Sequence, residues 1–209
     1  MARRPDWLAG IDAQATIGID AALFDAVRRA YDSPGRHYHA WPHIEACLAE
    51  FRRTRFDHPR TALLALLFHD AVYVPGRSDN EARSAELADR LIAEHSDLPA
   101  DVRRRVSELI VLTASHHAGA GLDDDARKFI DIDLAVLGAP WPAYRAYADG
   151  VKREYCPAVV TEPQFSAGRL AFLDALLRQP QIYLTAEMRE RREAAARRNI
   201  AAERAALST

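Results

Sequence analysis

Apolar residues recur along the chain at the three- and four-residue spacing of amphipathic helices, and apolar and polar positions nowhere alternate over a sustained stretch. The segments with helical spacing are separated by turn-forming Gly and Pro residues. The predicted helices cover residues 20–31, 42–51, 59–68, 78–92, 101–113, 126–137, 142–155, 161–177 and 185–206. This pattern predicts an all-α fold, a single bundle of eight or nine helices with a long C-terminal helix.

Two of these segments differ from an ordinary amphipathic helix. Residues 59–68 are apolar on almost every side, which predicts a central, buried helix. Residues 185–206 are rich in alanine and charged residues, so we expect a helix that faces solvent on most sides, either as an appendage or as a homodimer contact. We expect one domain over residues 1–209, with its core at about 20–180.

The composition is that of an ordinary soluble globular protein. The chain has 209 residues, 49% hydrophobic and 28% charged, and a formal net charge of −2. A dedicated nucleic-acid-binding protein would be more basic, so no nucleic-acid partner is expected. Two N-terminal arginines are followed by no apolar segment, and the longest apolar run, residues 62–68, is too short to cross a membrane. With Cys47 and Cys156 far apart, we expect reduced thiols in a cytoplasmic protein.

Six of the eight histidines fall in three short segments, at 37–43, at 69 and at 116–117. His69 and Asp70 close the most hydrophobic helix. A buried carboxylate without a partner costs several kcal/mol, and the helix dipole disfavours negative charge at this end. Because no Lys or Arg lies within local helical reach, a divalent cation bound jointly with the imidazole would satisfy the site. The alternative is that Asp70 caps a loop beside a hydrogen-bonded core histidine.

A second buried carboxylate is expected in the apolar segment 129–137, which contains Asp131 and Asp133. These two residues face different sides of a helix, so at most one of them is a direct ligand in a shared site. His43 borders the apolar face of the helix at 42–51, where a histidine alone is typical of core packing. Two imidazoles and two carboxylates together suit Mn²⁺, Fe²⁺, Co²⁺ or Zn²⁺, with Mg²⁺ as a further alternative.

The order His43, His69-Asp70, Asp133 on separate helices resembles the HD-domain superfamily of metal-dependent phosphohydrolases. The flanking sequence is similar to one bacterial subfamily of predicted HD phosphohydrolases in RHYHAWPHI, FHDAVY, DIDLAVLG, VKREY, GRLAFL and ARRNIAAE, and in the pairs Asn80-Glu81 and Ser84-Ala85. The resemblance covers roughly residues 31–203. It implies an all-helical fold, a divalent metal held by His43, His69, Asp70 and Asp133, and hydrolysis of a phosphate ester or anhydride by a metal-activated water. It implies no particular substrate.

Several residues near these motifs are candidates for further roles. Asp70 or Asp133 would orient the attacking water, and Glu81 or His116 would protonate the leaving group. Glu81 also fits a capping box with Ser78, and Gln164 fits a second capping box with Thr161. Alternatively, His116 supports a metal ligand without touching the metal, or is itself a ligand of a second metal ion. Phosphate contacts are expected from residues of the histidine-rich and VKREY/GRLAFL segments, although arginines are usually solvated surface residues. These candidates are Arg36, His39, Lys152, Arg153 and Arg169.

The leading hypothesis is a metal-dependent phosphohydrolase that acts on a small phosphorylated molecule, a nucleotide among the options. Two alternatives stay open. One is a di-iron oxygenase of the HD type, which needs more ligands than four. The other is a non-catalytic nucleotide-binding module with the same fold. A homodimer is a further option for the C-terminal helix.

Overall fold

The computed structural model describes residues 6–16, 18–115 and 121–208. The α-helices in these residues are α1 (Ala21–Ala30), α2 (Trp41–Phe51), α3 (Pro59–Phe68), α4 (Asn80–His95), α5 (Ala100–Leu112), α6 (Asp124–Asp133), α7 (Trp141–Tyr155), α8 (Glu162–Arg178), α9 (Ala186–Met188) and α10 (Ala194–Leu207). A π-helical turn at Arg189–Glu193 joins α9 to α10 in one 22-residue helix, so the described residues form nine helices and no strand. The predicted all-α fold and long C-terminal helix are confirmed. None of these helices is both long and apolar enough to span a bilayer.

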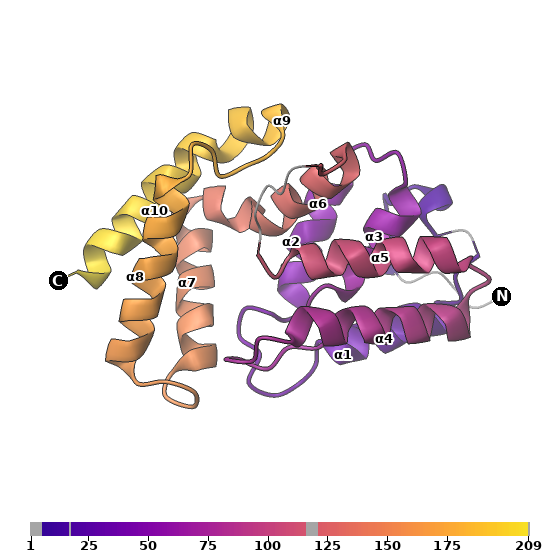
Figure 1. The fold of residues 1–209 in the computed structure, drawn as a ribbon, viewed down its shortest axis with the longest axis horizontal. Coiled ribbons are helices and arrows are strands. Elements are labelled where there is room, and N and C mark those ends of the chain that lie inside the picture. Colours follow the sequence, from indigo (N-terminus) through magenta and orange to yellow (C-terminus); the bar gives the residue numbers. More distant parts are fainter. Residues whose placement is uncertain (1–5, 17, 116–120, 209) are drawn as a thin grey trace.

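Helix α3 is the centre of the fold. Every residue from Thr61 to Phe68 is buried, and α3 contacts α2, α4, α5 and α6 (Figure 1). The central, buried helix predicted from residues 59–68 is therefore present with the same bounds. Its apolar surface fixes the position of its C-terminal end, where His69 and Asp70 follow.

Figure 1 shows two groups of helices side by side. Helices α1 to α6 form the larger group around α3, and α7, α8 and α10 form the second. Helix α10 packs against α8 and against a 3-10 turn at Leu134–Gly138 that follows α6. The buried apolar residues of both groups belong to one contiguous cluster that extends from Leu8 to Ile200.

The C-terminal helix is docked on the core and is not an appendage. Ala196 and Ile200 are fully buried, and Asn199 donates from Nδ2 to the carbonyl oxygens of Leu137 (2.9 Å) and Ala139 (2.8 Å). These bonds satisfy carbonyl groups at the C-terminal end of the 3-10 turn. The remaining faces of the helix are largely solvent-exposed, as its charged sequence predicts.

One of the two predicted capping boxes forms. At the start of α8, Gln164 accepts from the backbone N–H of Thr161 at 2.9 Å. The box predicted for residues 78–81 is wrong, because Asp79 occupies the N-cap of α4 without a side-chain cap bond. The Asp79 carboxylate instead accepts two bonds from the guanidinium of Arg77, at 2.6 and 2.7 Å.

A buried ion cluster joins α2 to the C-terminal helix. Glu50 is 5% exposed and accepts from Arg191 at 2.7 Å and from Arg192. Burial raises the pKa of Glu50, but the two guanidinium groups lower it by more, so the pKa lies below its ordinary value. Ionised Glu50 therefore stabilises the folded state above the ordinary pKa of about 4.3, and this contribution is lost as pH falls through the lower folded pKa.

We predict that Glu50→Gln lowers the free energy of unfolding by about 2 kcal/mol at pH 7, because it removes two charge-assisted contacts. The deficit should shrink in acid, where Glu50 of the unsubstituted protein is also protonated. Urea unfolding between pH 7 and pH 3.5 measures this, with the exposed Glu86→Gln as control. A deficit that is independent of pH would contradict the assignment.

Candidate metal centre

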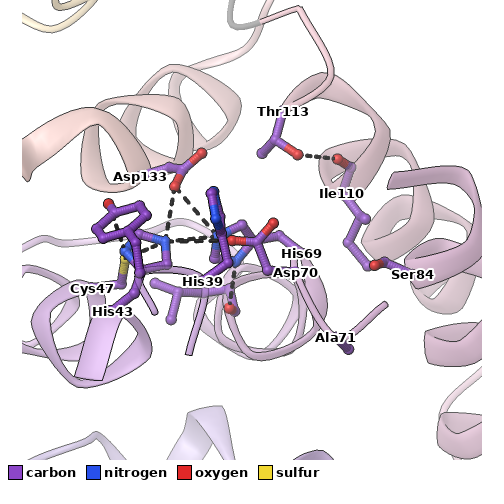
Figure 2. Close-up of polar contacts among 12 residues, drawn as sticks. His39, His43, Cys47, His69, Asp70, Ala71, Ser84, Ile110, Thr113 and Asp133 are labelled. Carbon is purple, nitrogen blue, oxygen red and sulfur yellow. Dashed lines mark hydrogen bonds and ion pairs between the residues drawn. The ribbon is translucent and has the colours of Figure 1, made fainter. Parts of the chain in front are cut away.

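Four side chains from three helices converge at the C-terminal end of α3 (Figure 2). His43 comes from the first turn of α2, His69 and Asp70 directly follow α3, and Asp133 is the last residue of α6. The Nε2 atoms of the two histidines are 3.1 Å apart. Asp133 Oδ1 lies 3.2 Å from His43 Nε2 and 3.3 Å from His69 Nε2. Asp70 Oδ2 lies 3.1 Å from His69 Nε2 and 3.7 Å from His43 Nε2.

These separations fit the ligands of one divalent cation. Nitrogen and oxygen ligands bound at about 2.0–2.2 Å lie about 2.8–3.6 Å apart for octahedral to tetrahedral angles. Two neutral imidazoles that present lone pairs to each other at 3.1 Å repel, so positive charge belongs between them. The donor set of two imidazoles and two carboxylates suits a borderline metal ion. His43, His69, Asp70 and Asp133 are therefore the residues that would hold it.

The electrostatics of the cluster favour positive charge. Asp70 and Asp133 both lie at helix C-terminal ends, where the dipole disfavours a carboxylate. Burial lowers the pKa of His69, but Asp70 and Asp133 outweigh it and raise that pKa well above its ordinary value. Burial likewise raises the pKa of Asp70, while the positive charge of His69 and other nearby histidines brings it below its ordinary value.

Each imidazole is oriented by a hydrogen bond at its other nitrogen. His69 Nδ1–H donates to the carbonyl oxygen of Leu66 at 2.8 Å, so in the neutral imidazole the lone pair of Nε2 points toward the cluster. His43 Nδ1 lies 3.0 Å from the hydroxyl of Tyr38, which accepts when Nε2 is a ligand. Such outer partners are characteristic of metal-binding histidines because they fix the tautomer and the ring orientation.

Cys47 offers a competing ligand beside this cluster. Its Sγ lies 3.7 Å from His43 Nε2, and His43, Cys47 and Asp133 together have metal-compatible spacing. Burial raises the pKa of the Cys47 thiol well above its ordinary value, and the carboxylates of Asp133 and Asp70 raise it further. The Cys47 thiol is therefore protonated in the metal-free protein, and a metal bound to it would have to displace that proton.

Asp131 has a structural role on the opposite side of α6. Its carboxylate accepts from the backbone N–H groups of Leu184 (2.6 Å) and Thr185 (2.8 Å), and from the Thr185 hydroxyl (2.6 Å). These bonds anchor the start of the C-terminal helix. Of the two carboxylates that the sequence left open, Asp133 is the one that reaches the cluster.

Arg36 is committed to the backbone of this region. Its guanidinium donates to the carbonyl oxygens of His39 (2.8 Å), Asp70 (2.7 Å) and Ala71 (2.9 Å). The side chain predicted to contact phosphate therefore fastens the histidine-rich turn to the segment that carries Asp70. It does not line the cavity described below.

Two residues of α4 hold the loop that follows Asp70. Asn80 pairs with both backbone groups of Val74 at 3.0 Å, and Ser84 pairs with both backbone groups of Val72 at 3.0 and 3.1 Å. Asn80 is 6% exposed and Ser84 is fully buried. The pairs noted in the resemblance thus fix the backbone beside the cluster.

Glu154 was missed by the sequence reasoning. It is buried in α7, and its Oε1 accepts the backbone N–H groups of His37 (2.8 Å), Tyr38 (2.7 Å) and His39 (2.9 Å). Its Oε2 lies 2.7 Å from His39 Nδ1, and the His39 ring stacks on Tyr73 with centroids 3.9 Å apart. This contact spans more than 100 residues of sequence, so the only local signal was its place in the VKREY segment.

A cavity of about 500 Å³ opens above the cluster, between the two groups of helices. The side chains of Asp70 and Asp133 line it and are 13% and 14% exposed, whereas those of His43 and His69 lie beneath at 3% and 2%. Glu81 also lines the cavity. A bound molecule can therefore reach the carboxylate side of the cluster.

The other predicted substrate and catalytic residues are spread more widely. His39 lines the cavity, whereas Lys152 and Arg153 do not. Lys152 forms an ion pair with Glu162 near the end of α7. His116 lies outside the described residues.

Comparison with known proteins gives no relative. No family model matches the chain, and no curated protein or solved structure is significantly similar to it. The resemblance to the HD-domain superfamily therefore rests on the sequence motif, and membership stays a prediction.

The contrast between Asp131 and Asp133 gives a matched pair of variants. We predict that Asp133→Asn lowers the stoichiometry of bound Mn²⁺ or Zn²⁺, while Asp131→Asn keeps it. Asp131→Asn should instead lower the free energy of unfolding by about 1–3 kcal/mol, because a side-chain amide would face buried N–H donors. Elemental analysis after dialysis and urea unfolding measure the two effects. Equal metal content in both variants would contradict the assignment.

Proposed function

We propose that this protein is a metal-dependent phosphohydrolase that cleaves a phosphate ester or anhydride of a small molecule. The observation that carries the proposal is the convergence of His43, His69, Asp70 and Asp133 within 3.1–3.7 Å at the floor of a ligand-sized cavity. The family resemblance, itself a prediction, points to the same chemistry.

The four cluster residues have different proposed roles, according to their depth in the site. His43 and His69 lie beneath the surface and would hold the cation, and Asp70 and Asp133 would complete its ligands from the cavity side. A divalent cation bound there would lower the pKa of a coordinated water and polarise a phosphoryl oxygen. The cavity-facing side of Asp70 is placed to accept a hydrogen bond from the attacking water and so to orient it.

The reaction is a displacement at phosphorus by water. The water oxygen forms a new P–O bond, and the P–O bond to the leaving group breaks. One water proton is released, and the leaving oxygen takes up a proton. Glu81 in the cavity wall is the candidate donor for that proton, since it is not used as a helix cap. His39 also faces the cavity and uses Nδ1 for Glu154, so its Nε2 is the atom available to a bound phosphate.

The test is a phosphatase assay on protein purified without chelator, with Mn²⁺, Fe²⁺, Co²⁺, Zn²⁺ and Mg²⁺ compared. We predict that His69→Ala and Asp70→Ala each lower kcat/KM by at least about 100-fold, because even outer-partner changes at metal sites cost 10–100-fold. His58→Ala is the matched control, since the His58 side chain is 78% exposed and pairs with Asp125, not with a cluster residue.

The outcomes separate the proposal from its alternatives. Undiminished hydrolysis in both cluster variants would refute the proposal. Two irons per chain together with O₂ consumption would favour the di-iron oxygenase. Tight nucleotide binding without turnover would favour the non-catalytic nucleotide-binding module.

A further inference from the structure

The cavity extends well beyond the candidate metal centre. Its far side is formed by α7, α8 and the segment between them. We call this surface the distal wall; its residues are Val151, Tyr155, Val160, Phe165, Gly168 and Phe172. All but the glycine are apolar or aromatic, and the polar residues Gln164 and Arg169 of α8 line the cavity beside them. The same cavity reaches Asp70 and Asp133 on the opposite side, so one ligand can contact both.

The cationic side chains that line the cavity are already paired. Among the described lining residues, only Arg77 and Arg169 carry a full positive charge. Arg77 binds both carboxylate oxygens of Asp79. Arg169 is 7% exposed and donates to Glu203 at 2.8 and 3.0 Å and to the hydroxyl of Tyr147 at 2.9 Å.

The charges of the cavity wall limit how many phosphate groups a substrate can carry. The cavity wall contains the carboxylates of Asp70, Glu81 and Asp133 and no unpaired guanidinium or ammonium group in the described residues. A chain of phosphates needs several cationic contacts away from the metal. A single phosphate group at the metal centre needs none of them.

Gly168 keeps the distal wall open. It lies in the middle of α8, where glycine is unfavourable relative to alanine. Gly168 is solvent-exposed, and a Cβ atom added there would meet nothing within 4 Å, so this edge of the cavity has room for a larger side chain. Phe172, one turn further along the same helix, lines the cavity and is 39% exposed.

We propose that the substrate is a phosphate monoester whose alcohol carries an apolar, ring-sized body. This rests on the proposed function. The single phosphate lies at the Asp70 and Asp133 end, and the apolar body packs against the distal wall. Water adds to phosphorus, the ester P–O bond breaks, and the alcohol oxygen takes a proton, so the products are the alcohol and inorganic phosphate. A cavity of about 500 Å³ is of the size that ligands of this class occupy.

The test compares 2-phenylethyl phosphate with ethyl phosphate, because their alkyl leaving groups have similar intrinsic reactivity. We predict that kcat/KM is at least about tenfold higher for the phenylethyl ester, as expected for an added apolar group in a matching pocket. Gly168→Leu should abolish most of that advantage and leave ethyl phosphate hydrolysis within about twofold. Ala171→Leu is the matched control, since Ala171 is an exposed residue of α8 outside the cavity lining.

Calorimetric binding of the two corresponding phosphonates, which are not hydrolysed, supplies a readout without turnover. Tighter binding of 2-phenylethylphosphonate that Gly168→Leu weakens would support the apolar subsite even if no ester is cleaved. In that case the hydrolysis fails, and with it the proposed function, while the ligand class that the cavity binds stands. Equal kcat/KM for the two esters and equal affinity for the two phosphonates would overturn the inference, while the phosphohydrolase proposal stands. A preference for a nucleoside triphosphate over 2-phenylethyl phosphate would also overturn it. A melting temperature of Gly168→Leu at or above that of the unsubstituted protein confirms that the fold is intact.

Discussion

Two carboxylates and two imidazoles crowded at the end of a buried helix require positive charge, and the surrounding structure depends on that requirement. Four donor atoms lie within 3.1–3.7 Å, at helix ends whose dipoles oppose negative charge. The outer nitrogens of both rings are engaged by Leu66 and Tyr38. A single proton would offset one charge, whereas a divalent cation would offset both carboxylates and separate the two Nε2 atoms.

The rest of the fold holds this cluster in position from several directions. Helix α3 is buried on all sides, which fixes the segment that carries His69 and Asp70. Arg36, Asn80 and Ser84 fasten the backbone on either side of it, and Glu154 brings the histidine-rich turn onto α7. These side chains bind backbone groups, so they act by positioning. The second group of helices then closes a cavity over the carboxylates.

The parts that sequence predicted are those determined by local pattern. The apolar run at residues 59–68 predicted the central helix because no face of it suits water. The lack of a nearby cation pointed to His69 and Asp70 as half of a candidate metal site, and the fold brings both beside His43 and Asp133, while the metal itself stays a prediction. The capping box at residues 78–81 failed because α4 begins one residue later than the box requires, with Asp79 and not Ser78 at its N-cap. The role of Glu154 and the distal wall could not be predicted, because both depend on contacts between segments far apart in the chain.

The most direct measurement of the central claim is anomalous X-ray scattering from crystals grown with Mn²⁺ or Zn²⁺. The account predicts one anomalous peak within about 2.0–2.3 Å of His43 Nε2, His69 Nε2, Asp70 and Asp133. A crystal grown with the metal that shows no anomalous peak at these four residues would contradict it. So would a peak elsewhere in the protein while the four side chains are held together by hydrogen bonds alone.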